Sequence, residues 1–102
     1  MPTKITFIYD NPTDPDAFEA AYPENLALAK KLPGITKVET SKVWPKEDGS
    51  PTPAYRTIDL YFENYDAASA AVSGAEAGAL FPNVQEIATG GVRILFNHLE
   101  ES

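Results

Sequence analysis

The apolar pattern of residues 4–10, KITFIYD, predicts a strand. Ile5, Phe7 and Tyr9 fall on one face, and the residues between them leave the other face fairly apolar as well. β-branched and aromatic residues favour strands, and two apolar faces are typical of a strand in the middle of a sheet. The segment 11–15, NPTDP, ends this strand.

A helix is predicted to begin at Pro15, where the missing N–H of proline costs nothing. Asp14 can cap this helix, and residues 33–34, Pro-Gly, stop it. One face, at a spacing of three to four residues, collects Phe18, Ala21, Tyr22, Asn25, Leu28, Ala29 and Leu32. Pro23 lies inside the helix, where it removes a backbone hydrogen bond and clashes with the preceding turn. We therefore expect a kink, or two short helices that meet at Tyr22–Glu24.

Three more strands are predicted at residues 35–43, 55–62 and 92–100. The segment 44–53, WPKEDGSPTP, contains three prolines and a glycine, so we expect a loop or a long hairpin turn there. Residues 66–81, which are rich in alanine, are predicted to form the second helix.

The second helix has several candidate boundaries. Asn64 or Asp66 can cap it, and Gly74 or Gly78 can interrupt it. We expect a short segment, framed by residues 82–83 and 90–91, between this helix and the last strand.

The resulting order, β-α-β-β-α-β, is the ferredoxin-like arrangement: an α+β fold in which an antiparallel four-stranded sheet carries both helices on one face. With 102 residues and 11.1 kDa, the chain forms one domain, residues 1–102, with a single thin core. Large rings occur in both alternating sets of the strand at 55–62, so the open face would expose more apolar surface than a monomer tolerates. We therefore expect a homodimer through the open sheet face. The alternative is that this face is polar enough to stay wet.

Composition narrows the chemistry. The chain has no cysteine, which excludes disulfides, thiol catalysis and zinc–thiolate sites. His98 is its only histidine, so a His-rich metal site is implausible, and we expect neither a metal nor a cofactor. With 15 acidic and 8 basic residues and a net charge of −7, nucleic acid and anionic membranes are poor partners. No apolar run approaches the roughly 20 residues that span a bilayer, and no signal-peptide pattern opens the chain, so we expect a cytoplasmic protein.

Four segments together resemble the EthD family of dimeric α/β-barrel proteins, which is named for a protein associated with ethyl tert-butyl ether degradation. They are ITFIYDNPTDPDAFEAAY, the L-x-L-A-K-K-LPG run at 26–34, ETSKV with its following DGSP, and FPNVQEIATGGVRILF. They cover nearly the whole length in the right order. The resemblance implies a ferredoxin-like subunit whose sheets pack face to face in a dimer, with a pocket between the sheet and the helices of each subunit.

The chain departs from the family pattern at two positions. Relatives often read F-E-x-H-Y where this chain has FEAAY at 18–22, and H-x-P-L where it has NLAL at 25–28. Ala21 and Asn25 thus replace both histidines, and acid–base chemistry by imidazole at these positions is lost. The family resemblance then implies at most a reductase-like or a cyclase- or isomerase-like activity. No glycine pattern for nucleotide binding supports it, since Gly90-Gly91 precedes a strand and does not open a helix.

Asn25 is the first candidate catalytic residue, because it lies near the centre of the apolar stripe of the first helix. A buried amide without a partner costs about 1–3 kcal/mol, so a side chain, a water or a ligand should bind it. It can polarise a carbonyl or hold a water, but it cannot shuttle protons near neutral pH as imidazole does. Three interpretations stay open: a pocket wall, a satisfied structural amide, or exposure after a kink.

Tyr22, one turn earlier, is the second and weaker candidate catalytic residue; the alternative is a core aromatic with its hydroxyl at the rim. The predicted ligand pocket comprises Phe7, Tyr9, Phe18, Tyr22, Asn25 and Tyr61. Which tyrosines face the helices depends on the sheet register, because a slip of one residue exchanges the faces.

The remaining candidates have simpler explanations. His98 lies near the chain end without a triad pattern and is expected on the surface or in an interface. Asp14 and Asp16 suit a helix N-terminus. Trp44 is expected either to pin the proline-rich loop against the body or to mark the rim of the dimer.

Two functions follow. The protein either acts on or binds a hydrophobic small molecule, in degradation or secondary metabolism, with Asn25 and the tyrosines orienting its oxygen atoms. Alternatively, because the histidines are replaced, it is a non-catalytic ligand-binding or structural dimer. A cavity lined by Asn25 and aromatic side chains would favour either ligand-based function over the purely structural one.

Overall fold

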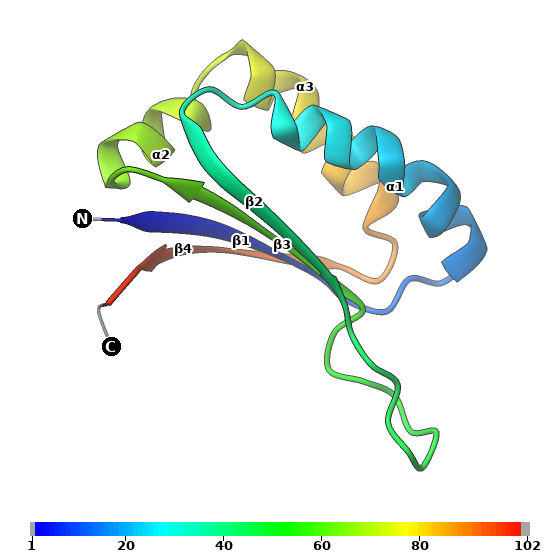
Figure 1. Ribbon diagram of the computed structural model, residues 1–102. Helices are drawn as coiled ribbons and strands as arrows, with labels where there is room; N and C mark the ends of the chain where they lie inside the picture. The colour runs from blue at the N-terminus through cyan, green and yellow to red at the C-terminus, as the bar shows by residue number, and fades with distance from the viewer. Residues whose placement is uncertain (1, 101–102) are drawn as a thin grey trace.

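The computed structural model describes residues 2–100 and forms two layers, with the helices on one face of a single sheet (Figure 1). The elements, in chain order, are β1 (Thr3–Tyr9), α1 (Pro15–Lys30), β2 (Ile35–Lys42), β3 (Arg56–Phe62), α2 (Tyr65–Ala71), α3 (Ala75–Ile87) and β4 (Val92–His98). The sheet order is β2-β3-β1-β4, and each neighbouring pair is antiparallel. The predicted ferredoxin-like α+β fold is confirmed. No helix among the described residues is long and apolar enough to cross a membrane.

The core lies between the central strands and the helices. Ile5 and Phe7 of β1 lie opposite Leu60 and Ile58 of β3, and all four are almost fully buried. Tyr9 extends the same row and is fully buried. The central position of β1 agrees with its apolar sequence, because both of its edges are paired and one face is covered by helices.

The first helix is continuous from Pro15 to Lys30, with Pro23 inside it. The predicted division into two short helices is therefore wrong. Proline removes the hydrogen bond of its own N–H and crowds the preceding turn, but most of a helix's stability in a protein comes from packing of its apolar face. As predicted, the Asp14 carboxylate caps the helix by accepting a hydrogen bond from the Ala17 N–H at 3.2 Å.

The second helical segment is split, as predicted, and Gly74 lies at the division between α2 and α3. Asn64 caps α2 by accepting from the Ala67 N–H at 2.8 Å. The predicted end at residue 81 is wrong, because α3 continues through Pro82 to Ile87. The buried stripe of α3 comprises Ala77, Leu80, Val84 and Ile87. Its helical spacing reaches past the proline, so packing again overrides the local break signal.

The open face of the sheet is mostly polar. The Thr6 hydroxyl donates to the Asp59 carboxylate at 2.6 Å, and the Asn97 amide donates to Thr6 Oγ1 at 3.0 Å. Tyr61 donates to Glu39, which raises the pKa of the phenol to about 12. The sequence predicts large rings on both faces of the strand at 55–62, and Tyr61 is the large ring on the open face.

Tyr55 does not follow the alternation of that strand. Its ring contacts Phe18 edge-on, with centroids 5.3 Å apart, and its hydroxyl donates to Glu19 at 3.1 Å on α1. Residue 55 precedes β3, and its N–H donates to the Tyr9 carbonyl at 2.7 Å. Because Tyr55 lies just outside the regular ladder, period-two alternation does not predict its direction.

Residues 43–55, which we call the arm, connect β2 to β3 and project from the sheet on the side away from the helices (Figure 1). The predicted loop at 44–53 is confirmed. Trp44 lies in it with 88% of its surface exposed. The idea that Trp44 pins the loop against the body of its own subunit is therefore wrong.

The turn before β4 passes close to the turn after β1. The Asp10 N–H donates to the Gly91 carbonyl at 3.0 Å. A Cβ atom at Gly90 would lie 1.9 Å from the carbonyl oxygen of Asn11, so only glycine permits this approach.

Replacing Gly90 by alanine should therefore lower the free energy of unfolding by at least about 2 kcal/mol, because the backbones of both turns must shift. Gly78→Ala is the matched control, since nothing lies within 4 Å of its Cβ position inside α3. That change should raise stability by up to about 1 kcal/mol through helix propensity. Urea denaturation measures both, and equal effects of the two substitutions would contradict the steric argument.

Candidate functional site

A chain of two hydrogen bonds, one buried and one partly buried, joins β1, α1 and α3. The Tyr9 hydroxyl donates to Asn25 Oδ1 at 2.9 Å, and the Asn25 amide donates to Asn83 Oδ1 at 2.9 Å. Asn25 itself has no exposed surface. The interpretation that Asn25 is exposed after a kink is therefore wrong. Both ends of its amide have partners, as a satisfied structural amide requires.

Aromatic rings surround this chain of hydrogen bonds. The Phe18 ring meets Tyr9 edge-on, with centroids 5.2 Å apart, and stacks with Tyr22 at 5.9 Å. The fold thus brings together four of the six predicted pocket residues: Tyr9, Phe18, Tyr22 and Asn25. All four belong to the buried part of the domain.

The other two predicted pocket residues lie elsewhere. Phe7 is buried in the same row of β1, but its ring stacks with Phe81 at a centroid distance of 6.3 Å. Tyr61 lies among the polar side chains of the open sheet face, where Lys4 and Lys37 approach its ring at 5.8 and 5.3 Å. The sheet therefore separates Tyr61 from Asn25.

The Tyr22 hydroxyl is the exception to the otherwise paired polar groups of this cluster. It is buried and has no hydrogen-bond partner among the described residues. Burial raises the pKa of this phenol, and the charge of Arg56 opposes that increase. Thr40 on β2 also lies near the hydroxyl and acts to lower its pKa, but the two groups are not in hydrogen-bond geometry. The Arg56 guanidinium lies 4.3 Å from the centre of the Tyr22 ring. An unpaired buried hydroxyl is unusual and costs stability, so it marks a place where a ligand oxygen or nitrogen could be bound.

An ion pair beside Tyr22 completes the cluster. Arg56 donates from Nε to Glu19 Oε2 at 2.9 Å and from Nη2 to Glu19 Oε1 at 2.6 Å. Lys42 lies 4.0 Å from the same carboxylate. Such a two-point contact orients both side chains and fixes the edge of the aromatic cluster.

Sequence reasoning missed this pair, although a signal was present. Arg56 opens the alternating set that contains Ile58, Leu60 and Phe62, which face the helices. A cation in an inward-facing row requires an acidic partner. Glu19, on the helix above, is that partner.

The ionisable groups of the cluster titrate far from neutral pH. Hydrogen bonds from Arg56 lower the pKa of Glu19 to about 2, and hydrogen bonds to Glu19 raise the pKa of Arg56. Burial raises the pKa of the Tyr9 phenol well above its usual range. These groups can therefore bind and orient a ligand, but their protonation states do not change near neutral pH: Glu19 stays ionised, and Tyr9 and Arg56 keep their protons.

Three cavities, with volumes of about 390, 460 and 380 Å³, lie elsewhere on the described part of the chain. The first lies beside α2 and the end of β4, and His98, which is exposed as expected, is part of its lining. The other two belong to the arm and its base. None of these three is lined by Asn25 or Tyr22. Within residues 2–100, no group of three or more His, Cys, Asp or Glu side chains could hold a metal.

The four-stranded antiparallel sheet with its helices on one face defines a ferredoxin-like subunit. In this subunit, hydrogen bonds through Tyr9, Asn25 and Asn83 join β1, α1 and α3. An ethyl tert-butyl ether degradation (EthD) family protein from Bacillus halodurans has this fold, with a TM-score of 0.88 and 19% identity over 98% of this chain and 100% of that one. A dimeric ferredoxin-like protein of unknown function from Thermobifida fusca matches with a TM-score of 0.71 and 13% identity, over 97% and 92% of the two chains. SnoaB, a cofactor-independent oxygenase from Streptomyces nogalater, matches with a TM-score of 0.66 and 13% identity, over 99% and 94%.

At the level of sequence, the chain is 32% identical over 98 residues to an uncharacterised 11.0 kDa protein of Rhodococcus erythropolis, encoded in the thcB-thcC intergenic region. The match covers 95% of this chain and 94% of that protein. No family model matches the chain. The chain belongs to the same family as the Rhodococcus protein, and its fold supports the EthD-like assignment that its sequence motifs indicate.

Replacing Asn25 by leucine should lower the free energy of unfolding by about 2–3 kcal/mol, because it leaves the Tyr9 hydroxyl and the Asn83 amide without their partner. In the double variant Tyr9→Phe/Asn25→Leu, the orphaned phenol is absent as well, and about 1 kcal/mol should return. Denaturant titration measures both variants. Equal or greater destabilisation of the double variant would show that the buried link is not the cause.

The Glu19–Arg56 pair should make stability depend on pH in the acid range. The folded-state pKa of Glu19, about 2, lies below its ordinary value of 4.5. Its stabilising contribution is therefore present above pH 4.5 and is lost as the pH falls from 4.5 to 2. The side chain is one-third exposed, so solvent screening limits the loss to about 1 kcal/mol.

Thermal melts between pH 2 and 7 test this dependence. Glu19→Gln should flatten the profile in the window from 4.5 to 2. Glu24→Gln, an exposed position of the same helix, removes a carboxylate without removing a contact to Arg56 and should leave the profile as it is. An unchanged profile in Glu19→Gln would contradict the prediction.

Proposed function

We propose that this protein is a cytoplasmic homodimer that binds a hydrophobic small molecule between α1 and the sheet. The ligand carries an oxygen or nitrogen atom that hydrogen-bonds to the Tyr22 hydroxyl. The single observation that carries this proposal is that this hydroxyl is buried and unpaired, in a cluster whose other polar side chains are paired.

The exposure of β2 supports this position for the ligand. Tyr22 on α1 is buried, whereas Thr40 and Lys42 of β2 are exposed. β2 is an edge strand, so α1 can move away from it without breaking the pairing at the centre of the sheet. A ligand would enter by parting α1 from β2, and its apolar body would replace contacts among Phe18, Tyr22 and Val38.

Binding, and not acid–base catalysis, is favoured by the protonation states of the cluster. Glu19 stays ionised, Arg56 stays charged, and the Tyr9 phenol stays neutral near pH 7. The positions at which relatives often carry histidine hold Ala21 and Asn25 here. A general acid or base works best with a pKa near the operating pH, and this cluster offers none.

Dimerisation through the open sheet face is the second part of the proposal. A fold neighbour from Thermobifida fusca is described as dimeric, and in the present protein the helices leave one face of the sheet uncovered. Light scattering at micromolar concentration should give twice the mass of the chain.

Tyr22→Phe separates ligand binding from a structural role of the hydroxyl. The variant should be more stable than the natural protein by about 1 kcal/mol, because the unpaired hydroxyl is gone. Its affinity for compounds that co-purify with the natural protein, identified by mass spectrometry after denaturation, should fall about tenfold, which corresponds to one hydrogen bond.

Tyr65→Phe is the matched control, because Tyr65 is exposed on α2 and its loss of a hydroxyl should change neither quantity. Equal affinity of Tyr22→Phe and the natural protein would overturn the role of Tyr22. Absence of any bound small molecule, both in purified protein and in a panel of phenols and quinones, would overturn the ligand-binding function.

A further inference from the structure

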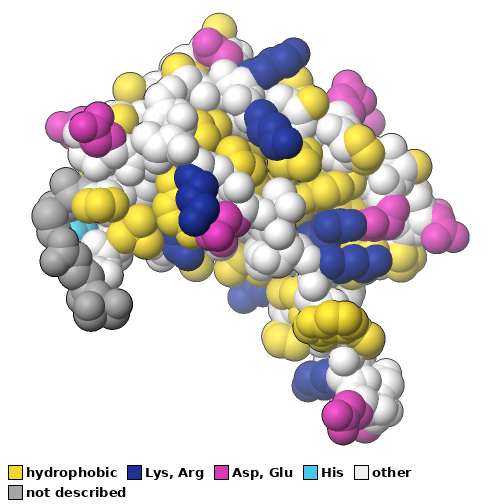
Figure 2. Space-filling model, in the orientation of Figure 1, with side chains coloured by type: hydrophobic (Ala, Val, Ile, Leu, Met, Phe, Trp, Pro, Cys, Tyr) yellow, Lys and Arg dark blue, Asp and Glu magenta, His cyan; other side chains and the backbone are white. Residues whose placement is uncertain are grey.

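The arm carries Trp44, the largest exposed apolar side chain among the described residues. Trp44 is 88% exposed, next to Val43 and Pro45. In Figure 2 hydrophobic side chains gather on the arm, below the body of the domain, while charged groups lie at its tip. An indole this exposed contributes nothing to the core of its own subunit.

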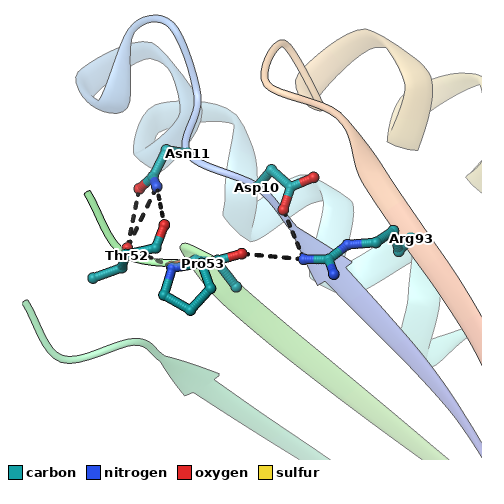
Figure 3. Close-up of polar contacts among 6 residues, drawn as sticks. Asp10, Asn11, Thr52, Pro53 and Arg93 are labelled. Carbon is teal, nitrogen blue, oxygen red and sulfur yellow. Dashed lines mark hydrogen bonds and ion pairs between the residues drawn. The ribbon is translucent and has the colours of Figure 1, made fainter.

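Side chains from two parts of the fold, the turn after β1 and the start of β4, fasten the base of the arm (Figure 3). The Asn11 amide donates to the Thr52 carbonyl at 2.8 Å. Arg93 donates to the Pro53 carbonyl at 3.1 Å, and the same guanidinium pairs with Asp10 at 2.8 Å. The direction of the arm is therefore set by the ends of β1 and β4 and not by β2 and β3 alone.

The tip is ordered by its own contacts. The Gly49 N–H donates to the Lys46 carbonyl at 3.1 Å, in a turn that requires the positive φ of Gly49, +75°. Asp48 accepts from both the N–H and the hydroxyl of Ser50. Three prolines further restrict the chain. The arm thus presents Trp44 in one place, which lowers the entropy lost when a partner binds it.

The open sheet face by itself is a small interface. Four strands about 4.8 Å apart, three of seven residues and one of eight, with a rise of about 3.3 Å per residue, give a projected area of roughly 460 Å². A stable interface of standard size buries about 800 Å² per partner. The face is also largely polar, and Leu95 is its one large apolar side chain classed as exposed, at 45%. A buried tryptophan adds about 150–250 Å², and a symmetric pair of copies would add two.

We propose that the arm of each subunit closes over the open sheet face of a second copy and buries Trp44 there, beside Leu95. This inference rests on the homodimer of the proposed function. The arm projects on the side of the open face (Figure 1), so a copy packed on that face meets the arm. A twofold axis between the sheets lets both arms make the same contact, which gives a closed dimer.

Trp44 is the only tryptophan of the chain, so its fluorescence reports its own environment. In the dimer, its emission should be shifted to shorter wavelength and protected from acrylamide quenching, compared with protein unfolded in urea. Dilution should move the emission toward the unfolded value as the dimer dissociates. Trp44→Ala should raise the dissociation constant of the dimer tenfold or more, as buried aromatic anchors do.

Leu95→Lys, on the sheet face, should also weaken the dimer tenfold or more. Tyr65→Ser is the matched control: Tyr65 is another exposed large aromatic side chain, but it packs against Phe96 at the helix-covered side, and its loss should not change the dissociation constant. Sedimentation velocity across a dilution series measures all three variants.

The outcomes separate this inference from the function on which it rests. A dimer whose Trp44 emission equals that of the unfolded chain, or whose dissociation constant is unchanged by Trp44→Ala, overturns the arm contact and leaves the homodimer standing. Shielding of Trp44 only after a different protein or a small molecule is added also overturns it. A monomer at micromolar concentration overturns the homodimer and the arm contact together, while ligand binding at Tyr22 is judged by its own titration.

Discussion

The amide of Asn25 is the interaction on which the arrangement of this domain depends. It links the central strand β1, through Tyr9, to α3, through Asn83, and it does so from within α1. A helix that rests on a sheet by apolar contacts alone can slide, because those contacts are not directional. Two directional hydrogen bonds, one buried and one partly buried, define the position of α1 in this structure, and burial strengthens the bond from Tyr9. The orientation of Phe18, Glu19 and Tyr22 follows, since all three lie on the same helix.

The polar side chains along α1 differ in their hydrogen bonding. Asn25 and Glu19 have hydrogen-bond partners, whereas the Tyr22 hydroxyl, between them in sequence, has none within residues 2–100. The same geometry that stabilises the centre of the domain therefore leaves one donor free at the edge, beside β2. These residues are poorly suited to proton transfer near neutral pH. Under the proposed function, the Tyr22 hydroxyl binds the ligand while its neighbours on the same helix stabilise the domain.

The two faces of the sheet have different roles. The helix-covered face provides the core, and the open face carries paired polar side chains such as Thr6, Asp59 and Asn97. These pairs leave few apolar groups on this face for association. The arm adds the exposed indole of Trp44, and its base is hydrogen-bonded to the residues that follow β1 and to Arg93 of β4. In the proposed dimer, association depends less on the flat sheet than on this projection.

The sequence by itself determined the order of strands and helices and the capping of α1 by Asp14; for the second helical segment it offered Asn64 or Asp66 as the cap and Gly74 or Gly78 as the interruption, and the structure has Asn64 and Gly74. These features depend on residues close together in the chain, whose periodicity and capping chemistry are local. The tertiary structure decided what local rules could not. Helices α1 and α3 continue through Pro23 and Pro82, because packing outweighs one missing hydrogen bond. Tyr61 lies on the open face, and Tyr55 turns toward the helices, because register and the end of the ladder set their directions. The partners of Asn25 and of Arg56 lie 58 and 37 residues away, a separation that no pattern along the chain spans.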